Sequence, residues 1–180
     1  MPLPDDFAAE SLYTPDQWYL HDLVELDAEA HRVVATLDTT RIGQVVAAQR
    51  PWPAHPKHLP GAVAVQMTGT LGNLHAVYVM GLRMTEGWVG YGTHLRTAKF
   101  KRMGEIGPPV TAIGQSTRQR NLRGTWFLDY TFRFEQEGEL VYESHQTAAW
   151  TRSEHRGPCP PPRRRERVRS LFSRIGARLR

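Results

Sequence analysis

The stretch Trp52–Met80, WPAHPKHLPGAVAVQMTGTLGNLHAVYVM, decides the fold of this chain. Two histidines, His55 and His58, precede a Pro-Gly pair. An apolar segment with almost no charge then continues for about five helical turns. Its polar residues are scattered, so the pattern predicts a helix that is buried on most sides and ends near Gly81. The same polar residues interrupt it too often for a membrane span.

The start of this predicted helix suits chemistry on a carbonyl group. Pro60 fits just before the first turn, and Gly61 offers an amide without a side chain. Unpaired N–H groups and the helix dipole favour developing negative charge at that end. The two neighbouring histidines are of the right type to act as a base. The alternative interpretation is a glycine required by packing beside two ordinary loop histidines.

The segments around the helix predict β-strands. Before it, Trp18–Leu26 and His31–Thr39 suit a hairpin, while Arg41–Arg50 is ambiguous between a short helix and an irregular segment. After it come four longer strand patterns, the clearest of which alternates apolar and polar residues strictly. This order predicts an α+β domain, a curved antiparallel sheet wrapped around one long helix, which is the hotdog arrangement. The four later strands are expected at Trp88–Lys99, Val110–Arg120, Gly124–Glu135 and Leu140–Thr151.

The two ends of the chain differ from this middle part. Residues 1–16 are expected to form a loose N-terminal arm before a domain of residues 17–152. From residue 153 a Pro-rich spacer leads to Arg163–Arg180, where apolar residues recur at helical spacing among arginines. This basic amphipathic tail predicts contact with an anionic partner or a membrane surface. A solvated tail is the alternative.

The net charge of +5 comes from this tail. Residues 156–180 hold nine arginines and one acid, a net of +8, which leaves −3 for the rest of the chain. The basic balance therefore does not predict nucleic-acid binding by the folded domain. The single cysteine, Cys159, excludes a disulfide framework, and the histidines show no spacing typical of metal ligands. No apolar signal sequence opens the chain, so we expect a cytoplasmic protein without a cofactor.

The order and spacing of these segments resemble the 3-hydroxyacyl-acyl-carrier-protein dehydratases of the hotdog superfamily, over nearly all of Trp18–Trp150. The segment WYLHDLVELDAEAHRVVATLDTT is similar to that family's opening hairpin, and HLPGAVAVQMTGTLGNL to its Pro-Gly-led central helix. The segment TAKFKRMGEIGPPVTA resembles its basic strand, turn and next strand, and GELVYESHQTAAW its final strand. A weaker similarity, around HPKHLPG, is to the hotdog domains of γ-butyrolactone biosynthesis enzymes.

In the dehydratase family a loop histidine acts with a carboxylate five residues after the Pro-Gly glycine, whose amide holds the thioester carbonyl. The resemblance makes Gly61 that glycine, and Gln66 occupies the carboxylate position. The family's loop length would place the histidine at Trp52. His55 takes the role only in a shortened loop, and His58 is nearer still. Gln66 can be neither acid nor base, so it either positions a water or another group through its amide or is a plain polar core residue.

The resemblance implies further contacts. It places Gly61, Ala62 and Gly69 against the substrate. It also implies a homodimer with paired edge strands and the acyl tunnel at the interface. A group of basic residues is expected to meet an acidic acyl carrier protein or the phosphate of its thioester arm, with a solvated strand edge as the alternative. These basic residues are Arg96, Lys99, Lys101 and Arg102.

The predicted function is therefore action on an acyl thioester, linked to an acyl carrier protein or to CoA, in fatty acid or polyketide metabolism. Dehydration of a 3-hydroxyacyl thioester comes first because the resemblance covers the whole domain. Hydrolysis by a thioesterase is a close alternative because Gln66 cannot supply a proton. A non-catalytic subunit that binds an acyl carrier is the third possibility.

Overall fold

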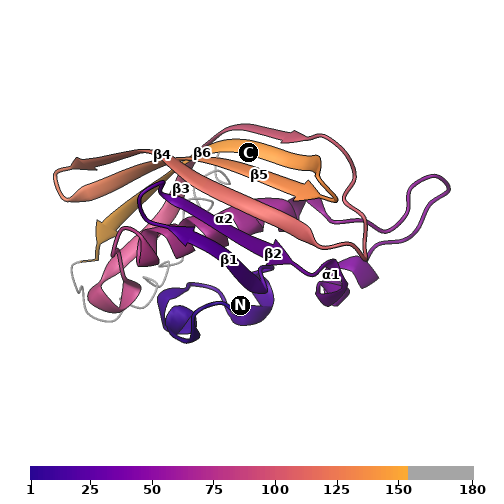
Figure 1. Cartoon of the computed structure of the whole chain (residues 1–180), viewed down its shortest axis with the longest axis horizontal. Helices are drawn as coiled ribbons and strands as arrows, with labels where there is room; N and C mark the ends of the chain where they lie inside the picture. The colour runs from indigo at the N-terminus through magenta and orange to yellow at the C-terminus, as the bar shows by residue number, and fades with distance from the viewer. Residues whose placement is uncertain (154–180) are drawn as a thin grey trace, which may run out of the picture.

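The computed structural model describes residues 1–153, so the predicted tail, Arg163–Arg180, lies outside the described residues. A six-stranded antiparallel sheet curves over one long helix, as Figure 1 shows, and its strand order is β1-β2-β4-β5-β6-β3. This arrangement confirms the predicted α+β hotdog fold. The strands are β1 (Asp22–Asp27), β2 (Arg32–Leu37), β3 (Trp88–Phe100), β4 (Val110–Leu122), β5 (Thr125–Gln136) and β6 (Glu139–Arg152). The helices are α1 (Gly43–Ala47) and α2 (Gly61–Tyr78), with short 3₁₀ turns η1 (Asp5–Glu10), η2 (Pro15–Gln17), η3 (Thr39–Arg41) and η4 (Met84–Glu86).

Two tight hairpins join the long strands β4, β5 and β6. Arg123 and Gly124 turn the first with φ angles of 52° and 84°, and Glu137 and Gly138 turn the second with 53° and 80°. Two residues with positive φ form the turn whose twist matches that of the flanking strands. The connection is therefore shorter than the gap between the predicted strands, since β4 continues to Leu122 and does not end at Arg120.

The helix α2 packs its apolar side chains into the concave face of the sheet. Met67, Leu71 and Leu74 are fully buried there with Phe134 and Leu128 of β5. The predicted end near Gly81 is three residues late, since the helix stops at Tyr78. Within residues 1–153 no helix combines the length and the apolar character needed to cross a bilayer.

Strand β3 forms one edge of the sheet. It pairs with β6, and its other side has no partner among the described residues. Three of its large apolar side chains are about half exposed: Tyr91 at 56%, Leu95 at 52% and Phe100 at 56%. The outer edge of β3, on the side away from β6, is therefore open among the described residues, and the strand carries exposed apolar side chains.

The N-terminal arm is not loose, contrary to the expectation for residues 1–16. Phe7 is fully buried and its ring centroid lies 4.7 Å from that of Trp18. Glu10 is also buried, and its carboxylate lies 3.2 Å from the Arg83 guanidinium. Asp6 also accepts a hydrogen bond from the Tyr78 hydroxyl at 2.7 Å, so the arm is anchored by single side chains that follow no periodic pattern in the sequence.

Candidate active site

The start of α2 leaves backbone donors unpaired. No side chain caps this end, and the first helical bonds run from the amides of Val63 and Ala64 back to the Pro60 carbonyl at 3.0 and 3.2 Å. Within the described chain, the amides of Gly61 and Ala62 are therefore left for an outside acceptor. Gly61 is half-buried and Ala62 is exposed. Such a helix end can hold a developing negative charge.

His58 is held firmly beside this helix end. Gln49 clamps its backbone, since the Gln49 amide nitrogen donates to the His58 carbonyl at 2.7 Å and the Gln49 oxygen accepts from the His58 amide at 3.1 Å. The His58 Nδ1 atom lies 3.0 Å from the Pro56 carbonyl oxygen. Because a carbonyl oxygen only accepts, Nδ1 carries the hydrogen, and the neutral ring has its lone pair on Nε2. His58 is thus set up as a base through Nε2.

His55 is less constrained. It is exposed on a loop that extends beyond the sheet between α1 and α2 (Figure 1). Its ring stacks on that of His58 with 4.8 Å between the centroids. The structure therefore brings both predicted histidines together, with His58 the better positioned of the two.

A cavity of about 390 Å³, here called the helix-start cavity, gathers several of these groups. His55, His58 and Gly61 line it, together with Phe100 and Arg102. The Phe100 ring lies so close that a Cβ atom added to Gly61 would approach it to 3.0 Å, which accounts for the glycine. The cavity thus combines a histidine base, the free amide donor of Gly61 and a guanidinium.

Gln66 lies elsewhere. It lines a second cavity of about 310 Å³ between α2 and strands β3, β5 and β6, here called the aromatic cavity because Tyr130, Phe132 and Trp150 form part of its walls. Gln66 is five residues after Gly61. Over five residues an α-helix rises about 7.5 Å and rotates about 140° more than one full turn, so the two residues lie on different faces of α2. Within one chain, the predicted histidines and Gln66 therefore line different cavities. Of the other predicted substrate contacts, Gly69 lines the aromatic cavity and Ala62 lines neither.

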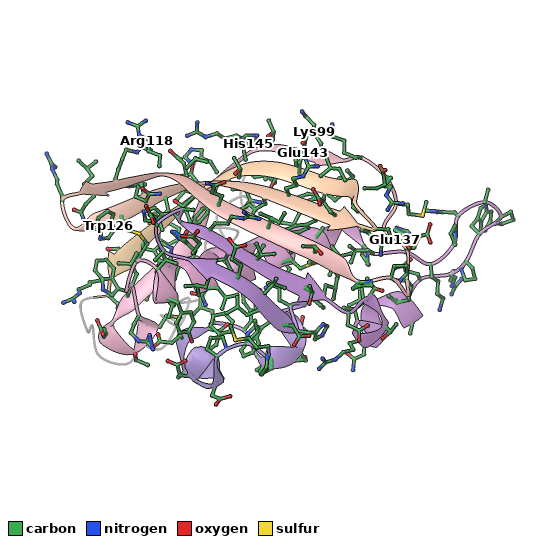
Figure 2. All side chains as sticks on the ribbon, in the orientation of Figure 1. Lys99, Arg118, Trp126, Glu137, Glu143 and His145 are labelled. Atoms are coloured by element: carbon green, nitrogen blue, oxygen red, sulfur yellow. The ribbon has the colours of Figure 1, made fainter. Side chains whose placement is uncertain are left out.

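The four predicted basic residues do not form one group. Lys99 and Lys101 lie 3.3 and 3.2 Å from the carboxylate of Glu143. Figure 2 shows Lys99 and Glu143 on the side of the sheet away from α2. Arg96 lies 3.7 Å from Asp129. Of the four, Arg102 alone lines one of the two described cavities. Its terminal nitrogen donates to the Gln136 carbonyl at 2.6 Å, and its Nε is buried without a partner among the described residues.

A buried histidine network was missed by the sequence reasoning. The His31 Nδ1 atom lies 3.2 Å from His75 Nε2, and His75 Nδ1 lies 2.9 Å from the Tyr130 hydroxyl. Burial, and then the neighbouring His31, lowers the pKa of His75 to about 4, so the ring is neutral at pH 7. The sequence did contain an indication of this network, because a histidine on a helix that is buried on most sides needs hydrogen-bond partners.

Acidic side chains are absent from both cavities. Neither is lined by an Asp or Glu of the described chain. Within residues 1–153, no three His, Cys, Asp or Glu side chains gather into a group that could hold a metal ion. The chemistry available to the described cavities therefore comes from histidine, arginine, amide and phenol groups.

Comparison with solved structures identifies relatives in fold. A mutant thioesterase from Pseudomonas aeruginosa superposes with a TM-score of 0.56 at 16% identity, over 84% of this chain and 96% of that one. The dehydratase heterocomplex ApeI:P from Xenorhabdus doucetiae gives 0.55 at 12% identity, over 79% and 88%. A thioesterase from Haemophilus influenzae gives 0.51 at 22% identity, over 76% and 82%.

At the level of sequence, no family model and no curated protein matches the chain. The likeness to these thioesterases and to the dehydratase thus lies in the three-dimensional arrangement, and identities of this size speak for fold alone. That arrangement is the six-stranded sheet curved around α2. By its architecture, this chain is a hotdog-fold protein.

Proposed function

We propose that this chain hydrolyses an acyl thioester at the start of α2. The observation that carries the proposal is the position of His58, whose Nε2 makes no hydrogen bond to any described residue and whose side chain lines the same cavity as Gly61. Thioester hydrolysis needs a base for water and donors for an oxyanion. The helix-start cavity offers both. The fold shared with thioesterases is consistent with this reaction.

In the proposed reaction the thioester carbonyl oxygen accepts a hydrogen bond from the amide of Gly61 at the start of α2. His58 Nε2 removes a proton from water while the water oxygen bonds to the carbonyl carbon. The negative charge on the tetrahedral intermediate rests at the helix end, where the dipole stabilises it. The C–S bond then breaks, and the departing thiolate takes the proton from His58. The products are a carboxylic acid and a thiol.

Arg102 is the proposed contact for the thiol part of the substrate. Its guanidinium lines the helix-start cavity, and its Nε has no partner among the described residues. Both CoA and the arm of an acyl carrier protein carry phosphate, which arginine binds well. Of the predicted basic residues Arg102 is the strongest candidate, because it lines this cavity whereas Lys99 and Lys101 pair with Glu143.

Dehydration of a 3-hydroxyacyl thioester is the second candidate. His58 could remove the Cα proton and return it to the departing hydroxyl, so one residue would serve as base and acid. The resemblance of the whole domain and the fold of the ApeI:P dehydratase favour this reaction. The described cavities offer no carboxylic acid for the leaving hydroxyl, and for this reason we place hydrolysis first.

The experiment that tests the proposal is incubation of the full chain with acyl- and 3-hydroxyacyl-thioesters of CoA and of N-acetylcysteamine. Mass spectrometry of the products and a thiol assay follow the reaction. A freed thiol supports hydrolysis, and loss of water without a thiol supports dehydration instead. Binding without any conversion would leave the third reading, a non-catalytic subunit that holds an acyl carrier.

A further inference from the structure

The aromatic cavity reaches the protein surface beside the N-terminal arm. Leu12 and Tyr13 line this cavity, yet the two residues are 64% and 54% exposed. The Trp18 indole nitrogen donates to the Ser11 hydroxyl at 2.9 Å and to the Tyr13 carbonyl at 2.8 Å, so this stretch of the arm is held in place. Two large apolar side chains exposed next to each other at a cavity opening favour a partner that covers them.

The chain around this opening is acidic. Residues 1–30 hold eight Asp and Glu side chains and no Lys or Arg, a net charge of −8. Arg83 pairs with two of these acids. Asp5 and Asp16, on either side of the apolar pair in the sequence, are exposed. A partner that fits this surface therefore combines apolar and basic side chains.

The segment Arg163–Arg180 of the same chain has this combination. It carries eight arginines and one acid, a net charge of +7, which is opposite to that of residues 1–30 and nearly as large. Its apolar residues recur at helical spacing and so share one face if the segment is helical. They are Val168, Leu171, Phe172, Ile175 and Leu179.

The described chain ends close to the opening. The Ser153 amide donates to the Gly87 carbonyl at 2.8 Å, and Gly87 directly follows η4. Met84 of η4 lines the aromatic cavity together with Leu12. Val168 follows Ser153 by fifteen positions, and an extended chain of that length spans about 50 Å. The segment can therefore reach the opening within its own chain.

A second exposed apolar position near the end of β6 has the wrong charge around it. Trp126 of β5 pairs with Trp150 of β6, so the β4–β5 hairpin lies beside this end of the strand. Leu122 in the hairpin is 62% exposed, but three arginines lie within four positions of it in the sequence. The hairpin therefore repels a basic segment, whereas the N-terminal arm attracts it.

We propose that Arg163–Arg180 binds across the opening of the aromatic cavity of its own chain. Its apolar side chains then lie on Leu12 and Tyr13, and its arginines face the acids of residues 1–30. The bound segment covers the opening, so a molecule that enters the aromatic cavity from this side must first displace it.

Disulfide trapping in the full chain tests this docking. In a Cys159→Ser background, Phe172→Cys is combined with Tyr13→Cys or, as a second pair, with Leu12→Cys. Mild oxidation should form a disulfide within one chain, which non-reducing electrophoresis and mass spectrometry detect. The matched control combines Phe172→Cys with Leu122→Cys, since Leu122 is similarly exposed and also near the end of β6. We expect trapping in the control to be at least tenfold slower.

Changes of charge locate the contact. Asp5→Lys together with Asp16→Lys should slow trapping several-fold. Glu137→Lys together with Glu139→Lys adds the same charge at the β5–β6 hairpin, at the other end of β6 from Arg152 (Figure 2), and should leave the rate unchanged. Raising the salt from about 0.1 M to about 1 M should also slow trapping, because the Debye length falls from about 10 Å to about 3 Å.

Several results would overturn the proposal. Equal trapping rates at Tyr13 and Leu122 would do so, and so would a rate that responds neither to salt nor to the two lysines in the arm. A disulfide that joins two chains would assign the segment to a second copy instead. Sedimentation of the chain with phosphatidylserine vesicles, without trapping at Tyr13 or Leu12, would assign it to a membrane surface.

Discussion

The Nδ1 atom of His58 lies 3.0 Å from the carbonyl oxygen of Pro56, and this contact decides which ring nitrogen can act as a base. The hydrogen is fixed on Nδ1, and Nε2 is left to accept a proton. A histidine held in this orientation can act as a general base on a water molecule. In this chain the orienting group is a backbone carbonyl in place of a carboxylate.

Replacing His58 should therefore remove the base. We expect His58→Ala to lower kcat/KM for thioester cleavage by about 10²–10⁴-fold, the usual contribution of general base catalysis. A thiol assay at constant pH measures the change. His145→Ala is the control, because His145 is exposed on the side of the sheet away from α2 (Figure 2). Equal activity of parent and His58→Ala would contradict the assignment.

Gln49 should act as a positioning residue for His58. Its side chain makes two hydrogen bonds to the His58 backbone, and each is worth about 1 kcal/mol. We expect Gln49→Leu to lower kcat more than it raises KM, and by less than His58→Ala does. Gln44→Leu is the control on α1, where the side chain is exposed. If Gln49→Leu leaves kcat unchanged, the clamp has no role in orienting the base.

His75 should make the protein sensitive to acid. Its pKa is lowered from 6.5 to about 4 in the folded chain, so the unfolded chain takes up a proton first as the pH falls. The stabilisation from the neutral buried ring is complete above pH 6.5 and is lost progressively down to about pH 4, by roughly 3 kcal/mol at most.

The measurement is urea unfolding of the parent and of His75→Gln at pH 7.5 and pH 4.5. The variant keeps a hydrogen-bonding side chain that does not titrate, so its free energy of unfolding should fall less over this range. Carboxylates titrate in both proteins, and their effect cancels in the comparison. Identical losses of stability would show that His75 does not carry the pH dependence.

The fold could be predicted from the sequence more completely than the site. Alternation along the strand that ends near Glu135 and the long apolar run after Gly61 are both local patterns, and both elements formed as expected. The closeness of His58 to Gly61 was also local, since they are only three positions apart in the sequence. The environment of Gln66 could not be predicted from local sequence, because it depends on the turn of the helix and on side chains of distant strands. Glu10 was missed for the same reason, since its partners lie far away in the sequence. The place of His75 on a buried helix did indicate that it needs partners, but the sequence could not say which residues these are.

Glu10 should be essential for the N-terminal arm. Its buried carboxylate accepts hydrogen bonds from the amide of Met84 at 2.6 Å and the hydroxyl of Thr85 at 2.6 Å, and it faces Arg83. Arg83 is 30% exposed and keeps Asp6 as a partner, so the loss comes mainly from the buried donors of Met84 and Thr85, at about 1–3 kcal/mol. We expect Glu10→Ala to lower the free energy of unfolding by an amount of this order, measured by urea titration. Asp5→Ala, an exposed change in the same arm, should have little effect, and a similar small effect of Glu10→Ala would contradict the role.

The open edge at β3 should be covered by a second copy of the chain. A strand of 13 residues whose outer edge has no partner among the described residues, with half-exposed Tyr91, Leu95 and Phe100, is a strong template for pairing. We expect light scattering at micromolar concentration to give twice the 20.5 kDa of one chain. Leu95→Lys should produce monomers, because a lysine on the edge opposes strand pairing and Leu95 contributes little to the buried core of its own chain.

Leu122→Lys is the matched control for this change. Leu122 is 62% exposed at the β4–β5 hairpin, away from the β3 edge, so the control should remain a dimer. Because Phe100 of β3 lines the helix-start cavity and Tyr91 lines the aromatic cavity, pairing at this edge would also shape both cavities. We therefore expect Leu95→Lys to lose thioester cleavage together with the dimer, while its circular dichroism spectrum shows that the chain stays folded. A parent protein that is monomeric at micromolar concentration and fully active would contradict the assembly.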